Sequence, residues 1–147
     1  MSDEKHAPQV SGWLRERGGD LAALEAEFAI LSAVHEGLIL LCYEPQSPHT
    51  LLVNECRGLV LSAADFSVVA WPMDRFFDVV ERSQVELVEP LLVEEKVDGS
   101  YIILFFDGRR WVACTRHTFC AIDPPYLDLI LAAADCASLD VLAAQAG

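Results

Sequence analysis

Lys96 is the residue whose surroundings most favour chemistry. It ends an apolar stretch, and a tight turn predicted at Asp98 and Gly99 leads into a second apolar run that starts at Ser100. An amine at the mouth of a sheet is partly sheltered from water, which disfavours its ammonium form and makes it a better nucleophile. Gly99 has no side chain, so a phosphate or a sugar has room to approach the backbone. The segment therefore predicts a nucleophilic lysine beside a turn that accepts a ligand.

The K-x-D-G pattern of Lys96, Asp98 and Gly99 is a weak signal by itself. Ordinary residue frequencies produce it by chance in a chain of this length on the order of a few per cent of the time. A surface lysine beside a turn is the better explanation of the bare pattern. Lysine is scarce, since the only other one is Lys5, but this scarcity establishes no role.

Two further blocks precede the lysine in order. The block ECRGLVL covers residues 55–61, WPMDRFFDVVE covers 71–81, and EKVDGS follows at 95–100. In order and spacing they resemble the adenylation domain of bacteriophage-type RNA ligase 1 proteins, which are covalent nucleotidyltransferases like DNA ligases and mRNA capping enzymes. The resemblance runs from about Leu38 to Thr118. Three blocks in register are far more specific than the K-x-D-G pattern alone.

The resemblance implies a role for each matching residue. Lys96 would attack the α-phosphate of ATP, release pyrophosphate and hold AMP as a phosphoramidate. Asp98 and Gly99 would shape the turn beneath the nucleotide, and Mg²⁺ would accompany the triphosphate and spread its charge. The other implied nucleotide contacts are Arg57, Arg75, Phe77, Glu95 and Arg116. Glu94 or Glu95 would pair with the lysine or face the adenine. RNA ends would be the later substrate.

The chain departs from the family pattern at three places. Arg75 stands where the PMDRFF-type block usually has lysine, and Arg116 stands at the position of a second family lysine. Arginine keeps the charge and grips phosphate with two nitrogens, but it cannot become neutral or reproduce the compact lysine ammonium. The later family strands, which carry a glutamate and phosphate-binding lysines, find no match after Thr118. We therefore expect no ligation by this chain alone. A missing C-terminal half, or association with a second copy of the chain, would be its partner.

Alternative explanations remain for these residues. Arg57 could be a strand-edge arginine paired with Glu55, and Phe77 could pack in the core, which is also the better interpretation of Phe76. A noncatalytic nucleotide-binding or protein-interaction remnant of the fold is the second hypothesis. A capping-type enzyme that uses GTP is a weaker third.

Composition excludes several classes of protein. The chain has 147 residues, about one domain, and a net charge of −13, so that nonspecific gripping of RNA by its whole surface is not expected. No apolar run reaches the roughly 18 residues of a membrane span, and the polar N-terminus does not look like a signal peptide. The five cysteines form no CxxC pair, so we expect reduced thiols in a cytoplasmic protein. The scattered histidines predict no metal cluster, and metal ligands stay unknown.

The apolar pattern predicts an α+β fold with a largely antiparallel sheet and flanking helices. By the resemblance, this would be an incomplete ATP-grasp-like nucleotidyltransferase domain that occupies residues 20–147 and follows a polar lead-in at 1–19. Asp20 caps a predicted helix that reaches about Glu36 and stops at Gly37. A second predicted helix runs from Tyr126 to Ala144. The predicted extended segments are 38–43, 57–62, 68–71, 85–95, 100–106 and 111–116, the last two joined by an Asp107-Gly108 turn.

Overall fold

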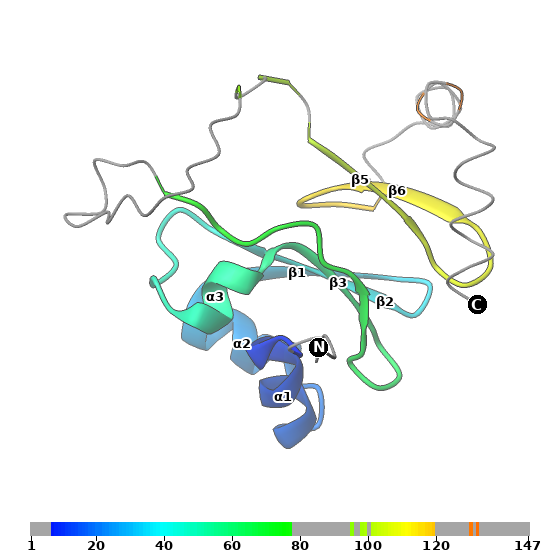
Figure 1. The fold of residues 1–147 in the computed structure, drawn as a ribbon. Coiled ribbons are helices and arrows are strands. Elements are labelled where there is room, and N and C mark those ends of the chain that lie inside the picture. The colour runs from blue at the N-terminus through cyan, green and yellow to red at the C-terminus, as the bar shows by residue number, and fades with distance from the viewer. Residues whose placement is uncertain are drawn as a thin grey trace, which may run out of the picture.

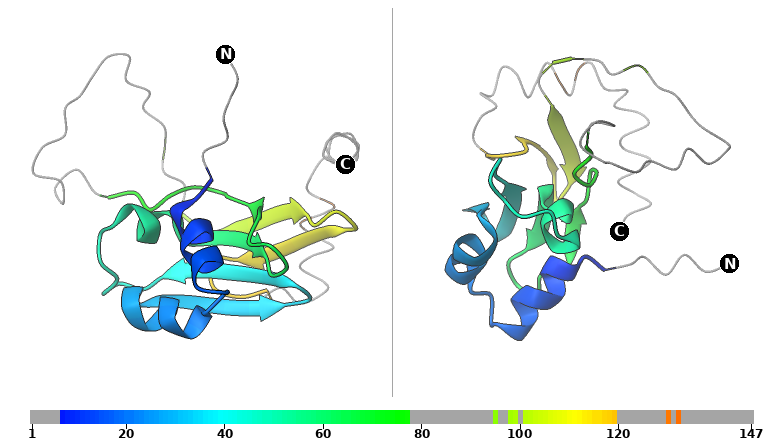
Figure 2. Two further views of the ribbon diagram at one scale, coloured as in Figure 1. Left: turned by 90° about the horizontal axis from the view of Figure 1, so that it is seen from below. Right: turned by 90° about the vertical axis from the view of Figure 1, so that its left-hand side faces the viewer.

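The protein has three layers (Figure 1). The computed structural model describes residues 7–77, 95, 98, 99, 101–119, 130 and 132. Three helices, α1 (Gln9–Glu16), α2 (Leu21–Phe28) and α3 (Leu51–Glu55), cover one face of an antiparallel sheet with the strand order β1-β2-β3-β4. An antiparallel hairpin of two strands lies on the opposite face. Figure 2 (left) views the molecule from the helix side, with α1 in front of the strands. The strands are β1 (Ile30–His35), β2 (Leu38–Tyr43), β3 (Arg57–Ser62), β4 (Val68–Ala70), β5 (Ile102–Phe106) and β6 (Trp111–Thr115).

The central strands β2 and β3 are buried on both faces. Because side chains alternate along a strand, Ile39, Leu41 and their β3 partners point toward the helices, where they share a core with Val10, Leu14 and Leu24. The intervening Leu40 and Val60 point the other way and pack against the hairpin. Burial on both faces explains why these two strands are continuous apolar runs.

The first helix was not predicted. Within the segment expected as a lead-in, residues 9–16 form α1, whose Val10, Trp13 and Leu14 are buried in the core on the helix side. Pro8 offers no side-chain cap, and the Glu55 carboxylate accepts from the Val10 N–H at 3.3 Å instead. This first part of the chain is therefore integral to the core, while the domain boundary at residue 20 stays a prediction.

The predicted helix from Asp20 to Glu36 is wrong in its second half. The Asp20 side chain caps the helix as expected, by accepting from Ala23 N at 2.9 Å, but α2 ends at Ala29, which adopts a left-handed φ of 52°. The chain then forms β1. Gly37 ends no helix, because it lies with Glu36 in a two-residue hairpin turn in which both φ angles are positive.

The remaining strand predictions are confirmed where the structure describes them. Strands β2 and β3 and the hairpin of β5 and β6 lie within a residue or two of their predicted limits, and the fold is α+β with antiparallel sheets. The segment after β2 contains the unpredicted α3, whose N-cap Thr50 accepts from Val53 N at 3.3 Å. Residues 85–94 lie outside the described residues, and of the predicted C-terminal helix only Ile130 and Ala132 are described, both helical. No helix in the described part of the chain is long and apolar enough to cross a membrane.

Gly58 allows the hairpin to approach the sheet closely. It adopts a φ of +81° at the start of β3, beside the register shift between Leu41 and Cys42. A β-carbon at this position would lie 2.4 Å from Ile103 Cδ1 and 3.3 Å from Arg116 Cα. Only glycine combines this backbone conformation with the absence of a side chain. Gly58 thus determines how near β5 and β6 come to β3.

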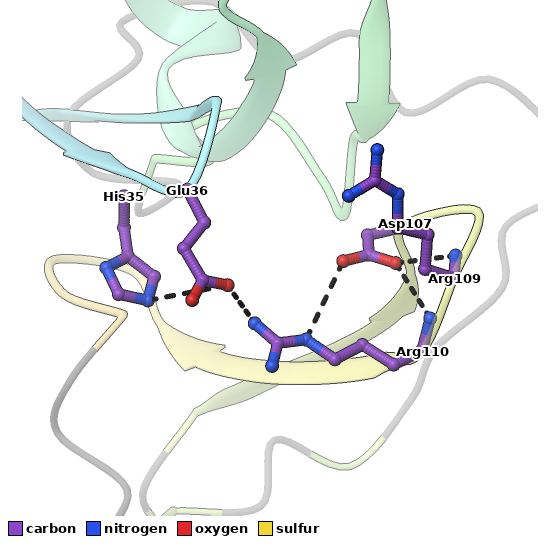
Figure 3. A network of polar contacts seen from close by, with 5 residues as sticks. All are labelled: His35, Glu36, Asp107, Arg109 and Arg110. Atoms are coloured by element: carbon purple, nitrogen blue, oxygen red, sulfur yellow. Dashed lines mark hydrogen bonds and ion pairs between the residues drawn. The ribbon is translucent and has the colours of Figure 1, made fainter.

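At the other end, the tips of the two hairpins are joined by charges (Figure 3). Glu36, in the β1–β2 turn, pairs with Arg110, in the β5–β6 turn. Asp107 Oδ1 accepts from the backbone N–H groups of Arg109 at 2.7 Å and Arg110 at 2.8 Å, which shapes that turn. Opposite charges therefore hold the layers together at this end.

We predict that Gly58→Ala lowers the free energy of unfolding more than Gly37→Ala. Both glycines have a φ of +81°, but a β-carbon at Gly37 would meet nothing within 4 Å. The backbone strain, about 1–2 kcal/mol, is common to both variants, and the collision with the buried Ile103 adds about 1–3 kcal/mol at Gly58 alone. Urea unfolding of both variants measures the difference. Equal losses would show that the layers are not in close contact at Gly58.

We also predict that the stability of the Asp107→Asn variant falls less steeply than that of the parent when the pH is lowered from 5 to 2. Burial acts to raise the pKa of the Asp107 carboxyl, but the backbone N–H groups of Arg110 and Arg109 and their positive side chains outweigh it and leave the pKa below its usual value. A depressed carboxylate pKa stabilises the fold above the unfolded-state pKa of about 3.9, and this contribution is lost as the pH falls further. Urea midpoints measured from pH 5 down to pH 2 test it. If the urea midpoints of parent and variant fell in parallel with pH, the lowered pKa of Asp107 would be contradicted.

Candidate functional site

Two arginines from different layers meet at the end of the strands opposite the paired hairpin tips. Arg57 begins β3, and Arg116 directly follows β6. Gly58, the neighbour of Arg57, lies against the Arg116 backbone. Both guanidinium groups also act electrostatically on the thiol of Cys42, the residue that pairs with Arg57 across the sheet. The structure therefore brings together two residues that were predicted as nucleotide contacts.

The Arg57 guanidinium is held by aromatic rings. Its central carbon lies 4.5 Å from the centre of the Phe76 ring and 5.1 Å from that of Tyr101. Its Nη1 is buried without a hydrogen-bond partner. Among the described residues it forms no ion pair, and Glu55, its alternative partner, accepts from Val10 instead. Arg57 is thus oriented by stacking, and no carboxylate of the described residues compensates its charge.

Arg116 is positioned by a turn that Thr115 closes. The Thr115 hydroxyl accepts from the backbone N–H groups of His117 and Thr118, both at 3.2 Å, and Thr115 N donates to Thr118 O at 3.1 Å. Burial lowers the pKa of His117, and the positive charge of Arg116 lowers it further. In the part of the chain that the structure describes, no carboxylate pairs with Arg116. Arg116 is therefore a second cation that no carboxylate in the described ranges compensates.

Cys42 does not neutralise these cations. It is 1% exposed, and burial raises its pKa, although Arg116, Arg57 and the Gly58 N–H act in the opposite direction. A thiol with a raised pKa is uncharged at neutral pH. Two guanidinium groups near a neutral thiol, in a chain with a net charge of −13, form a local site for an anion. Phosphate is the common biological anion that arginine binds through paired nitrogens.

Arg75 and Phe77 both contact other side chains of the protein, which the prediction of nucleotide contacts did not include. The Arg75 guanidinium lies 4.4 Å from the Tyr43 ring centre and 5.2 Å from that of Phe77. Its Nη1 donates to Ser47 O at 3.4 Å, and the Phe77 ring lies 4.9 Å from that of His49. Both side chains are half-buried and hold the 71–77 segment against the end of β2. Their predicted nucleotide contacts stay predictions.

Phe76 and Tyr101 are site residues that sequence reasoning missed. Phe76 was expected in the core, yet its side chain is 59% exposed and lies on Arg57. Neighbouring residues of an extended segment point to opposite sides. Placing Phe77 toward the core would therefore have predicted that Phe76 faces outward. Tyr101 was taken as part of an apolar run, and its contact with Arg57 depends on the distant hairpin.

The residues around the predicted nucleophile are only partly described. Lys96 itself lies outside the described residues, whereas Glu95, Asp98 and Gly99 are exposed. Gly99 comes two residues before Tyr101, so the backbone separates them by at most roughly 7 Å. The predicted turn therefore lies close to the backbone of Tyr101, whose ring contacts Arg57. No cluster of three or more potential metal-ligating side chains occurs in the described ranges.

The chain is similar to a protein of Autographa californica nuclear polyhedrosis virus, whose name describes a bifunctional polynucleotide kinase and RNA ligase. The two sequences are 31% identical over 107 residues, which cover 62% of this chain and 15% of the viral protein. No protein-family model matches the chain. No solved structure matches it. The similarity suggests a relationship to RNA ligases, and the chain spans less than a fifth of the viral protein's length.

We predict that neutralising Arg57 lowers the free energy of unfolding and that neutralising Arg116 does not. Arg57→Gln loses two cation–aromatic contacts, which should lower the free energy of unfolding by about 1–2 kcal/mol. Arg116→Gln loses no ion pair among the described residues and removes a repulsion, so we expect the free energy of unfolding to stay within about 0.5 kcal/mol of the parent or to rise. Urea unfolding at low salt measures both. A loss at Arg116 as large as that at Arg57 would show that its charge is already compensated.

Proposed function

We propose that this chain is a nucleotidyltransferase part of an ATP-dependent RNA ligase, with Lys96 as the residue that accepts AMP. The observation that carries the proposal is the meeting of Arg57 and Arg116, each without a carboxylate partner among the described residues. The similarity to the viral protein and the three sequence blocks support the same class of enzyme.

The two arginines would bind the phosphates of ATP. A buried or half-buried cation without a partner is costly, and a phosphate that binds between two guanidinium groups removes that cost. The stacking of Arg57 on Phe76 and Tyr101 holds its nitrogens in place before the ligand arrives, so less conformational entropy is lost on binding. The wider acidic chain keeps polyanions away from other surfaces, so that binding is confined to this site.

Lys96 would supply the nucleophile. Its Nζ, once deprotonated, attacks the α-phosphorus of ATP, an N–P bond forms, the bond to the bridging oxygen breaks, and pyrophosphate leaves with the electron pair. Nearby positive charge disfavours an ammonium group, so two guanidinium groups at the site would lower the pKa of this lysine. The same groups would stabilise the charge that develops on the leaving pyrophosphate. The product would be AMP joined to Lys96 as a phosphoramidate, which a ligase passes on to an RNA end.

Magnesium would enter bound to the triphosphate, where it spreads the phosphate charge. The described residues contain no cluster of carboxylates or histidines that fits a resident ion.

A noncatalytic nucleotide-binding protein is the second candidate. Arginine stands at 75 and at 116, where the family that the chain resembles has lysine, and Arg75 is engaged with Tyr43 and Ser47. Binding of ATP without transfer of AMP would follow if these arginines hold phosphates but do not align them for attack.

Binding and transfer of α-labelled ATP test the proposal. We expect the chain to bind ATP with Mg²⁺, Arg57→Gln and Arg116→Gln to weaken binding roughly ten- to a hundredfold, as expected for charge-assisted hydrogen bonds, and Lys96→Ala to abolish label that survives denaturing electrophoresis. Arg109→Gln is the matched control, because it removes the same charge from the far end of the hairpin.

The outcomes separate the two candidates. Label that depends on Lys96 supports the ligase. Binding that depends on Arg57 and Arg116 but leaves no label supports the noncatalytic protein. Absence of binding, or equal weakening by Arg109→Gln, would overturn the phosphate site on which both rest.

A further inference from the structure

A second pocket lies outside the site of Arg57 and Arg116. It has a volume of about 660 Å³ and lies between α1 on one side and the β3–β4 turn and β4 on the other. Its lining includes Pro8, Ser11, Arg15, Phe66, Val68 and Trp71. None of these side chains is hydrogen-bonded to, ion-paired with or stacked on Arg57 or Arg116. The volume is within the range of pockets that hold small molecules. Its walls are mostly apolar, with a few polar groups.

Ser11 gives the pocket a polar group without a partner. The residue is 1% exposed, and its Oγ has no hydrogen-bond partner. Serine hydroxyls in helices commonly donate to the carbonyl four residues earlier, but here no such bond forms. Buried hydroxyl groups are normally satisfied, so this one calls for an external partner.

Arg15 gives the pocket a positive group. Its Nε donates to the backbone O of Asp65 at 3.0 Å. The Asp65 carboxylate is instead bonded to Ser67, with 2.7 Å to its hydroxyl and 3.1 Å to its N–H, and forms no ion pair with Arg15. Hydrogen bonds from Ser67 are the main cause that lowers the pKa of the Asp65 carboxyl, and the charge of Arg15 lowers it further. The Arg15 guanidinium is thus held in position by one nitrogen, and its other two nitrogens form no hydrogen bond to a described residue, so they can bond to a ligand.

The Phe66 ring forms an apolar wall of the pocket, and its position is fixed before a ligand binds. It adopts a left-handed φ of 58°, which is unusual for an aromatic residue. Its ring packs over Gly19, where a β-carbon would lie 2.6 Å from the ring Cζ. The position of this ring therefore depends on a glycine in a distant loop. Strained residues of this kind often occur where a binding surface is held in one shape.

We propose that this pocket binds a small aromatic monoanion. The ring of the ligand would lie against Phe66, Val68 and Trp71, a polar atom of the ligand would bond to the Ser11 hydroxyl, and its anionic group would pair with Arg15. The inference is independent of the proposed ligase function, because it uses neither Lys96 nor the two site arginines.

Titration with 1-anilinonaphthalene-8-sulfonate, an aromatic monoanion whose fluorescence rises on binding, tests the pocket. We expect saturable binding at one site. Ser11→Ala and Arg15→Gln should each weaken it roughly two- to tenfold, the effect of one lost hydrogen bond or charge contact. Val68→Trp fills the pocket and should weaken binding more than tenfold. Gly12→Ala is the matched control on the same helix, because its β-carbon would meet nothing within 4 Å.

Thermal unfolding of each variant shows that it is folded. Ser11→Ala removes an unsatisfied hydroxyl, so its melting temperature should not fall, and weaker binding by that variant then reports a lost contact. If Ser11→Ala and Arg15→Gln bind the probe as the parent does, or if Val68→Trp leaves binding intact, the probe binds elsewhere and the proposal is overturned.

Discussion

The contact at Gly58 is the constraint on which the other features of the site depend. A hairpin can approach β3 this closely only where the strand has no side chain, and Gly58 meets both Ile103 and Arg116 there. The residue before it is Arg57 and the residue opposite is Arg116, so the same contact that packs the two layers also brings two cations together. The packing of the core and the geometry of the site therefore depend on the same contact, to which Ile103 contributes a buried side chain and Arg116 a charge.

The charges at the two ends of this sandwich are arranged differently. At the hairpin tips, Glu36 and Arg110 form a pair of opposite sign, and Asp107 supports the turn. At the other end, Arg57 and Arg116 act on the same buried Cys42 thiol, and neither has a carboxylate partner among the described residues. A chain with 23 acidic residues had ample means to compensate these cations. Within the described residues such compensation occurs at the tips and not at Arg57 or Arg116, which is the arrangement expected of a site for an external anion.

Local patterns were sufficient for the strands and insufficient for the first helices. The apolar runs of β2 and β3 and the Asp107-Gly108 turn are strong signals, because burial on both faces and a tight turn each restrict composition. Leu31 and Val34 misled the prediction: their spacing extends the pattern of α2, but they are 45% and 60% exposed on β1. Helix α1 was missed because its cap comes from Glu55, a distant residue that no local pattern reveals.

The difference between local patterns and contacts of distant segments also explains which site residues could be predicted. Arg57 and Arg116 could be predicted from sequence blocks, since each lies at the end of a strand with a recognisable pattern. Their stacking partners could not, because the contacts of Phe76 and Tyr101 with Arg57 join segments that only the packed layers bring together. The two aromatic rings hold the Arg57 guanidinium without cancelling its charge, whereas a carboxylate in their place would have cancelled it. Aromatic stacking is therefore the means by which this fold orients a cation and still keeps it available to a phosphate.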